Sequence, residues 1–156
     1  MFTCMVLNIL LLISILYSQD SYCPYSYHNI SDSWRKVGSA RGRLCDNGPA
    51  TEASKLMDGN NWFRFVEPAG TKLSTTDIGP EACKTQASGW MNGSDPTSFG
   101  QIINNRVCFS WYSGGECSNK IDVKVALCRE NGNDPFYIYQ LKNIPWCNYL
   151  YCAISG

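Results

Sequence analysis

Nine cysteines in a chain of 156 residues constrain this fold more than any other feature of the sequence. Thiols at this density form an ordered framework when they are oxidised or bound to metal. Cys4 lies in an apolar N-terminal segment, and eight cysteines follow it. We predict that these eight all pair, in four disulfides, although their spacing leaves the connectivity open. They are Cys23, Cys45, Cys83, Cys108, Cys117, Cys128, Cys147 and Cys152.

Metal binding and thiol catalysis are the competing uses of cysteine, and the sequence favours neither. No Cys-x-x-Cys pair occurs and His28 is the only histidine, so the ligand spacing of a zinc site is missing. A catalytic thiol would leave one cysteine unpaired and would need a base beside it. We therefore expect no metal and no cofactor.

The N-terminal segment 5–16 is an apolar run broken only by Asn8 and Ser14. Its length is typical of the core of a secretory signal peptide and short for a membrane span. We predict that residues 1–18 are a signal peptide cut after Ser18, with a signal anchor as the alternative. No later stretch is apolar enough to cross a membrane, so we expect a secreted, extracellular product in which residues 19–156 form one domain.

The charge balance excludes one class of partner. Lys plus Arg and Asp plus Glu number 13 each, so the net charge is zero, whereas a nucleic-acid binder needs a basic face. Aromatic residues make up 13% of the chain and hydrophobic residues 44%, which is the composition of a folded domain.

Strand patterns dominate the chain after the N-terminal segment. Residues 121–127 alternate apolar and polar side chains with the period of two of a half-buried strand. The turn-rich stretch 130–135 follows, so 121–127 and the apolar segment 136–141 should pair as an antiparallel hairpin. Only 33–37 and 52–57 suit short helical turns. The predicted fold class is mainly β: a small, disulfide-stapled antiparallel β module with long loops and at most short helical turns.

A series of short motifs runs through the chain between the first and last of the eight cysteines. In order they are Trp34-Arg35, Cys45-Asp46, Trp-Phe-Arg-Phe at 62–65, Cys83, Trp-Met-Asn-Gly-Ser-Asp-Pro at 90–96, Phe-Tyr-Ile-Tyr-Gln-Leu at 136–141, and Cys147-x4-Cys152. This series resembles the eight-cysteine domain of the family that includes uromodulin and the zymogen granule membrane glycoprotein. The residues of the central motif that match are Trp90, Asn92, Gly93, Ser94 and Pro96, while Asp95 replaces the usual histidine.

Two sequons offer sites for N-glycosylation in a secreted chain, Asn29-Ile-Ser and Asn92-Gly-Ser. Asn-Gly followed by Asp-Pro cannot continue a helix or a central strand, so we expect Asn92 at an exposed turn with Trp90 tucked inward. The resemblance implies that a glycan at Asn92 is an oligomannose decoy for bacterial fimbrial lectins. The alternative is that both glycans only solubilise the surface.

Tyrosines and tryptophans are numerous, and most should fill the core of a small β module. Tyr22, Tyr25, Tyr27 and Phe99 are the candidates for exposed interface aromatics. The carboxylates show no acid pair, and no nucleophile elbow, metalloprotease helix or phosphate loop occurs. We predict a non-enzymatic module that binds an extracellular protein or a lectin. The most specific form of this prediction is that the module displays a glycan at Asn92. A protein-interaction surface made of exposed aromatics is the first alternative, and a small secreted hydrolase is the last.

Overall fold

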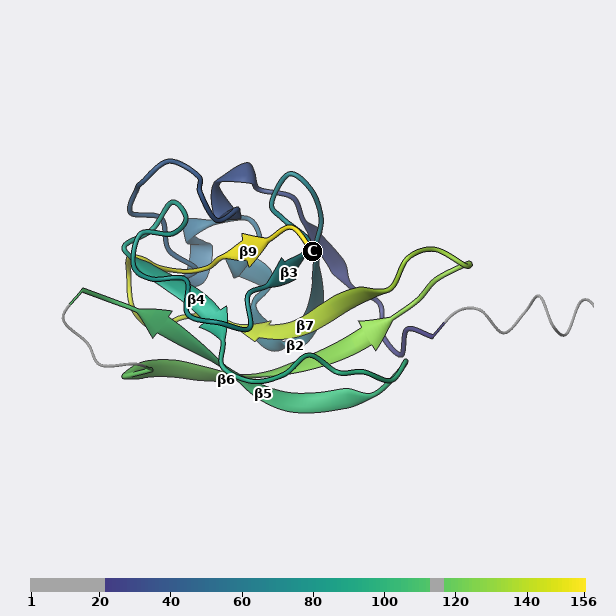
Figure 1. The fold of residues 1–156 in the computed structure, drawn as a ribbon. Helices are drawn as coiled ribbons and strands as arrows, with labels where there is room; N and C mark the ends of the chain where they lie inside the picture. Colours follow the sequence, from purple (N-terminus) through teal and green to yellow (C-terminus); the bar gives the residue numbers. More distant parts are fainter. Residues whose placement is uncertain (1–21, 113–116) are drawn as a thin grey trace, which may run out of the picture.

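The structure is a computed structural model that describes residues 22–112 and 117–156. A curved sheet of seven strands forms its body, and a pair of two-residue strands lies above the sheet (Figure 1). The large sheet has the order β1-β2-β7-β6-β5-β4-β8, and the small pair is β3-β9. The strands are β1 (His28–Ile30), β2 (Asp58–Phe65), β3 (Lys72–Leu73), β4 (Ala87–Met91), β5 (Ile102–Ser110), β6 (Asn119–Cys128), β7 (Phe136–Lys142), β8 (Tyr149–Tyr151) and β9 (Ala153–Ile154).

Helical structure is limited to three single turns in the part of the chain that the structure describes. They are η1 (Ser33–Arg35), η2 (Gly48–Ala50) and η3 (Ser54–Leu56). Two of the three fall within the segments 33–37 and 52–57 that the sequence marked for such turns. The third, η2, was not predicted, although it begins at a glycine and carries Pro49 in its first turn, where proline is favoured. The mainly β fold class is confirmed.

The predicted hairpin is confirmed as β6 and β7. The two strands run antiparallel in a register that sets Val125 opposite Tyr139 and Leu127 opposite Tyr137. Asn131 and Gly132 both adopt positive φ angles, 51° and 71°, in the connecting turn. Asparagine and glycine tolerate that backbone region better than other residues, which explains why the Asn-Gly pair stands there.

The pairing is mixed at the two edges of the sheet. The strands from β2 to β4 in the sheet order pair antiparallel, as expected from the hairpin pattern. The edge strand β1 instead pairs parallel with β2, and the opposite edge strand β8 pairs parallel with β4. Each of these strands has only three residues, and no period of two is visible in so short a stretch.

The two faces of the large sheet are covered by different segments of the chain. The main core lies on the inner face, beneath β3, β9 and the helical turns, and includes the fully buried Phe63, Phe109, Val125 and Tyr139. On the outer face, a second cluster forms where Cys23 and Tyr27 of the N-terminal segment pack on the sheet. That cluster contains Trp62, Ala126, Cys128, Phe136 and Ile138. The N-terminal segment therefore covers only one part of the outer face.

Three disulfides fasten the outlying segments to the sheet. Cys23–Cys128 holds the N-terminal segment, Cys83–Cys152 joins the approach to β4 with the residue after β8, and Cys108–Cys117 links β5 to the start of β6. These are three of the four predicted bridges. Cys45 and Cys147 are not bridged in the structure.

The signal peptide predicted at 1–18, with Cys4, lies outside the described residues. Within the described part of the chain, no helix has the length and apolar character needed to cross a membrane.

Candidate functional site

Asn92 lies at the point where the chain leaves β4. Its backbone N–H still donates to the carbonyl of Arg106 on β5, at 2.8 Å, while its side chain is exposed. Trp90, two residues earlier, is 8% exposed, and Met91 is fully buried. The expected exposed position of Asn92 after an inward Trp90 is what the structure shows. Glycosylation itself stays a prediction.

The turn after Asn92 is shaped by contact with β5. A Cβ on Gly93 would collide with the side-chain amide of Asn105, so a larger residue here requires that side chain to move. Asn105 in turn donates from Nδ2 to the carbonyl of Ser94 at 3.1 Å. Ser94, the hydroxyl residue of the sequon, is exposed. A rigid strand therefore holds the sequon from one side.

The remaining motif residues anchor the far side of the turn. Pro96 is buried, and Asp95 is half-buried. Asp95 Oδ2 lies 2.7 Å from Nζ of Lys72, which also lies over the ring of Tyr137 at 5.5 Å from its centre. Asp95 therefore serves as an ion-pair partner that ties the turn to β3.

Asn29 has a different setting. It lies on β1, an edge strand of three residues, opposite Arg64 of β2. Its side chain is exposed, as is that of Ser31. The structure therefore leaves both sequons open to solvent, and only Asn92 is set on a turn anchored at both ends.

The predicted exposed aromatics form two groups. Tyr22 and Phe99 stack with their ring centres 5.8 Å apart, and they are 45% and 39% exposed. Tyr25 is 45% exposed and stacks on Trp62, at 4.9 Å and an interplanar angle of 8°. Tyr27 differs from the expectation: it is half-buried, and its hydroxyl donates to a carboxylate oxygen of Glu130 at 3.0 Å.

Cys45 and Cys147 meet although they are not bridged. Burial raises the pKa of the Cys45 thiol, and the neighbouring side chain of Cys147 raises it further. Asp46 N–H donates to the carbonyl of Tyr149 at 2.9 Å, so the backbones that carry the two cysteines are already joined. The fourth bridge stays a prediction, now with a defined pair.

The two carboxylates with lowered pKa values, Asp58 and Glu67, are held by local hydrogen bonds. The pKa of Asp58 is lowered by hydrogen bonds from the backbone of Asn60 and then of Asn61, and that of Glu67 is lowered by the hydroxyl of Ser155 and then by Lys36. Among residues 22–112 and 117–156, no group of three His, Cys, Asp or Glu side chains is placed to hold a metal ion.

Sequence reasoning missed the residues of β5 that support the sequon. Asn105 and Arg106 lie more than ten positions beyond Asn92 in the sequence, and nothing in their immediate neighbours signals the contact. Only the strand register, which sets Met91 opposite Val107, brings them beside Asn92.

Comparisons with known proteins identify relatives of this chain by sequence. Residues 63–153 match the family described as the uromodulin-like eight-cysteine domain. The pancreatic secretory granule membrane major glycoprotein GP2 of Homo sapiens is 35% identical over 130 residues, which cover 83% of this chain and 21% of that protein. Uromodulin of Mus musculus is 30% identical over 128 residues, covering 82% and 18%, and uromodulin of Rattus norvegicus is 29% identical over 127 residues, covering 81% and 17%. The chain spans about a fifth of the length of the curated relatives it matches.

Proposed function

Because the chain belongs to the uromodulin-like eight-cysteine domain family, we propose that it is a secreted, non-enzymatic glycoprotein module that acts by extracellular binding and displays an N-glycan at Asn92 to lectins. The name of the human relative GP2 describes a glycoprotein of a secretory granule membrane. The sequon, the disulfides and the N-terminal apolar run of this chain agree with such a route.

The observation that carries the proposal is the position of Asn92. Its exposed side chain stands between two buried anchors, Trp90 before it and Pro96 after it. A glycan on this turn is attached to a backbone that is already ordered. A lectin that binds it therefore costs less conformational entropy than one that binds a glycan on a mobile segment. Asn29, on a three-residue edge strand, lacks such a second anchor.

Lectin capture of two single variants tests the proposal. The chain is produced in a eukaryotic secretory host, and Asn92→Gln is compared with the matched control Asn29→Gln. We expect a mannose-specific lectin to retain the wild type and Asn29→Gln and to lose Asn92→Gln, while circular dichroism of all three is the same. Retention of Asn92→Gln at the wild-type level, or an unmodified Asn92 in peptide mass spectrometry, contradicts the proposal.

A protein-interaction surface is the second candidate, and the stacked pair Tyr22 and Phe99 favours it. The guanidinium of Arg129 lies over Phe99 at 5.2 Å from the ring centre, so a cation borders these exposed aromatics. Aromatic and arginine side chains dominate interface energies. If this surface is the functional one, Tyr22→Ala with Phe99→Ala abolishes partner binding, whereas Asn92→Gln leaves it unchanged.

A further inference from the structure

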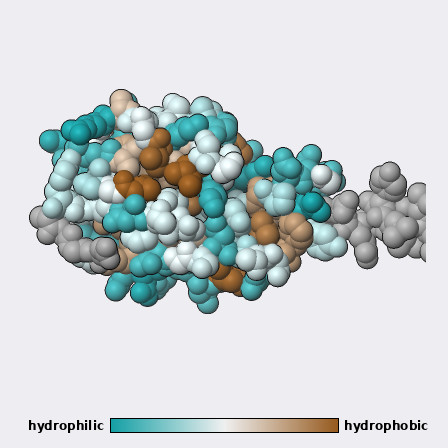
Figure 2. Space-filling view, in the orientation of Figure 1, coloured by the Kyte–Doolittle hydropathy of each residue, from teal (hydrophilic) through white to brown (hydrophobic). Residues whose placement is uncertain are grey.

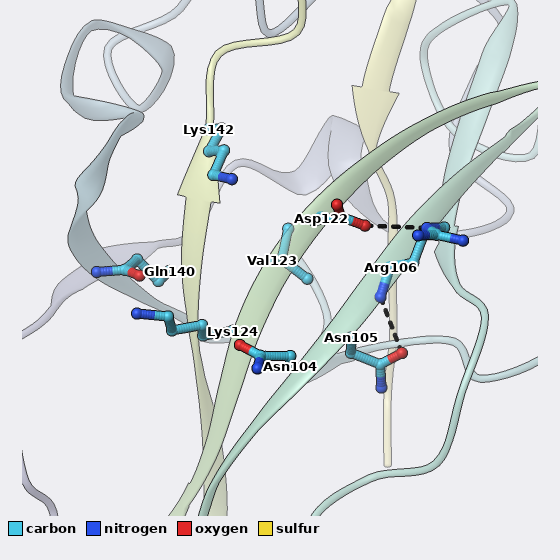
Figure 3. A pocket seen from close by; sticks show the side chains of 8 residues that line it. All are labelled: Asn104, Asn105, Arg106, Asp122, Val123, Lys124, Gln140 and Lys142. Carbon is cyan, nitrogen blue, oxygen red and sulfur yellow. Dashed lines mark hydrogen bonds and ion pairs between the residues drawn. The ribbon is translucent and has the colours of Figure 1, made fainter.

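A polar groove crosses the outer face of the sheet, beside the part that the N-terminal segment covers. Its larger half is a hollow of about 570 Å³ over β5, β6 and β7, and its smaller half, of about 380 Å³, continues over β2 to Tyr25. Asn104, Lys124 and Gln140 line both halves, so the groove is continuous. Figure 3 shows the larger half, with side chains from three neighbouring strands. Ligand sites commonly have volumes of about 300–1,000 Å³.

Four of the lining side chains form one row across the strands. Asn104 pairs with Lys124, Lys124 with Gln140, and Gln140 with Trp62, in consecutive antiparallel strand pairs. Directly opposed residues of such strands project from the same face, with Cβ atoms about 4.5–5.5 Å apart. The sheet therefore presents an amide, an ammonium group, a second amide and an indole at fixed intervals.

Two lysines leave the larger half of the groove with excess positive charge. Arg106 Nε lies 2.9 Å from Asp122 Oδ1, so these two charges offset each other. Lys124 and Lys142 are in no ion pair with a carboxylate of the described residues. In a chain of zero net charge, this excess favours an anionic occupant.

Two further titratable groups border the groove. Asp58 stands opposite Lys142 in the register of β2 and β7, but its carboxylate accepts the backbone N–H groups of Asn60 and Asn61 at 2.8 and 3.1 Å. His28 lies at the edge of the smaller half. Asp58 keeps its negative charge and so offsets part of the charge of Lys142, whereas Lys124 is in no ion pair with a carboxylate of the described residues.

The other lining groups favour a sugar over a peptide. Side-chain amides both donate and accept hydrogen bonds, as sugar hydroxyls do. The row supplies those of Asn104 and Gln140, and Gln140 Nε2 also donates to the carbonyl of Asn60 at 3.2 Å, which fixes its orientation. An extended peptide binds a sheet by adding to a free strand edge. Strands β2, β7, β6 and β5 all have a neighbour on both sides, so this face offers no such edge.

An aromatic platform closes the smaller half. Tyr25 stacks on Trp62 with their ring planes 8° apart, and 45% of Tyr25 is exposed. An aromatic face with negative charge density suits the C–H face of a sugar ring. Figure 2 shows that the face it presents is mostly polar, with its hydrophobic residues in a few groups.

We propose that this groove binds an acidic oligosaccharide. Its hydroxyl groups pair with the amides of the row, its carboxylate or sulfate lies between Lys124 and Lys142, and one ring rests on Tyr25. The site belongs to the protein surface and does not depend on a glycan at Asn92, so the two ideas fail separately.

Calorimetric titration of the full secreted chain, with its own N-glycans trimmed enzymatically, tests the groove. The probes are a heparin-derived oligosaccharide, a hyaluronan-derived oligosaccharide and a neutral cello-oligosaccharide of equal length. We expect saturable binding of an acidic probe that weakens with added salt, and at least about tenfold weaker binding of the neutral probe. Hyaluronan carries carboxylates alone, so a preference for heparin identifies sulfate as the recognised group.

Substitutions in and beside the groove separate specific binding from general attraction. Lys124→Gln and Lys142→Gln should each weaken binding about tenfold, the size expected for one charge-assisted hydrogen bond. Gln140→Leu should weaken it without a change of charge. Lys120→Gln is the matched control, since Lys120 is also exposed on β6 and lines neither half.

Several results overturn the proposal. They are the absence of saturable binding to both acidic probes, equal losses in Lys120→Gln and Lys124→Gln, and full binding by Gln140→Leu. Equal affinity for a polyglutamate peptide would assign the groove to acidic peptides instead. Near-ultraviolet circular dichroism of each variant shows that the fold is intact.

Discussion

Arg35 and Asp46 form a bidentate ion pair from which solvent is fully excluded. Nη1 of Arg35 donates to Oδ2 of Asp46 at 2.6 Å, Nη2 donates to Oδ1, and both side chains are 0% exposed. The pair also reaches the end of β8: Nη1 donates to the carbonyl of Tyr151 at 3.3 Å, and the Tyr151 N–H donates to Asp46 at 3.1 Å. One buried contact therefore joins η1, the loop after Cys45 and a sheet edge.

Removal of either charge should destabilise the fold strongly. A buried charge that loses its partner keeps its desolvation cost, so Arg35→Met or Asp46→Asn should each lower the free energy of unfolding by about 3–5 kcal/mol. The double variant should cost less than the sum of the two. Chemical denaturation measures these values. Lys36→Met is the control, because its ion pair with Glu67 is exposed and contributes about 0–1 kcal/mol. Similar costs for Lys36→Met and Arg35→Met would contradict this interpretation.

The motifs that carried the family resemblance now have physical roles. Trp34-Arg35 and Cys45-Asp46 supply the two halves of the buried ion pair, whose members are 11 positions apart in the sequence. The sequence predicted the mainly β class and the hairpin because a period of two and a turn-rich connector are local signals. The parallel partners of β1 and β8 could not be predicted in this way, since each depends on a strand far away in the chain.

Cys45 and Cys147 should be bridged in the secreted protein. The side chain of Cys147 neighbours the Cys45 thiol, and the oxidants of a secretory route accept the two electrons and two protons that the thiols lose when the S–S bond forms. We expect peptide mass spectrometry without reduction to find a Cys45–Cys147 crosslink and no alkylated thiol. Loss of the bridge in Cys147→Ser should lower the free energy of unfolding by about 2–5 kcal/mol. Alkylation of the exposed Cys147 in the native wild type would show that this bridge does not form.

Gly93→Ala should distort the turn that carries Asn92 while it preserves a valid sequon. The new Cβ collides with the Asn105 amide, so we expect a loss of about 1–3 kcal/mol in the free energy of unfolding. An Asn105→Ala background opens this space, so the same substitution should cost less there, while the part of the cost that comes from the positive φ angle of residue 93, 159°, remains in both backgrounds. A thermodynamic cycle over the four proteins measures this coupling. Equal costs in both backgrounds would mean that Asn105 does not restrict residue 93.

In the candidate site, as in the fold, local features could be predicted from the sequence and features that depend on strand register could not. The Asn92 turn was predictable because Asn-Gly and Asp-Pro act on their own backbone. The groove was not predictable, because Asn104, Lys124, Gln140 and Trp62 come from four strands and meet only through register. Each of the four by itself is an ordinary polar or aromatic strand residue.

Tyr139 and Tyr151 should make the fold sensitive to alkali. Both side chains are fully buried, and burial is the main cause that raises the pKa of each phenol above its ordinary value of 10.0. The unfolded chain then releases protons that the folded protein keeps. The stability that these groups provide is complete below about pH 10 and is lost above it, by roughly 1.4 kcal/mol per pH unit for each group.

Phenylalanine variants isolate this effect. Tyr139→Phe removes the hydroxyl that accepts the Leu73 N–H at 3.2 Å, and Tyr151→Phe removes the one that donates to the carbonyl of Lys142 at 2.7 Å, so each should cost about 0.5–1.5 kcal/mol at neutral pH. Above pH 10 the free energy of unfolding should fall less steeply with pH in each variant than in the wild type. The exposed Tyr22 provides the control as Tyr22→Phe. Denaturant titrations at a series of alkaline pH values, followed by tyrosinate absorbance, measure both quantities. Identical slopes in the wild type and in Tyr139→Phe would contradict this prediction. They would show that the phenol of Tyr139 ionises equally in the folded and unfolded protein.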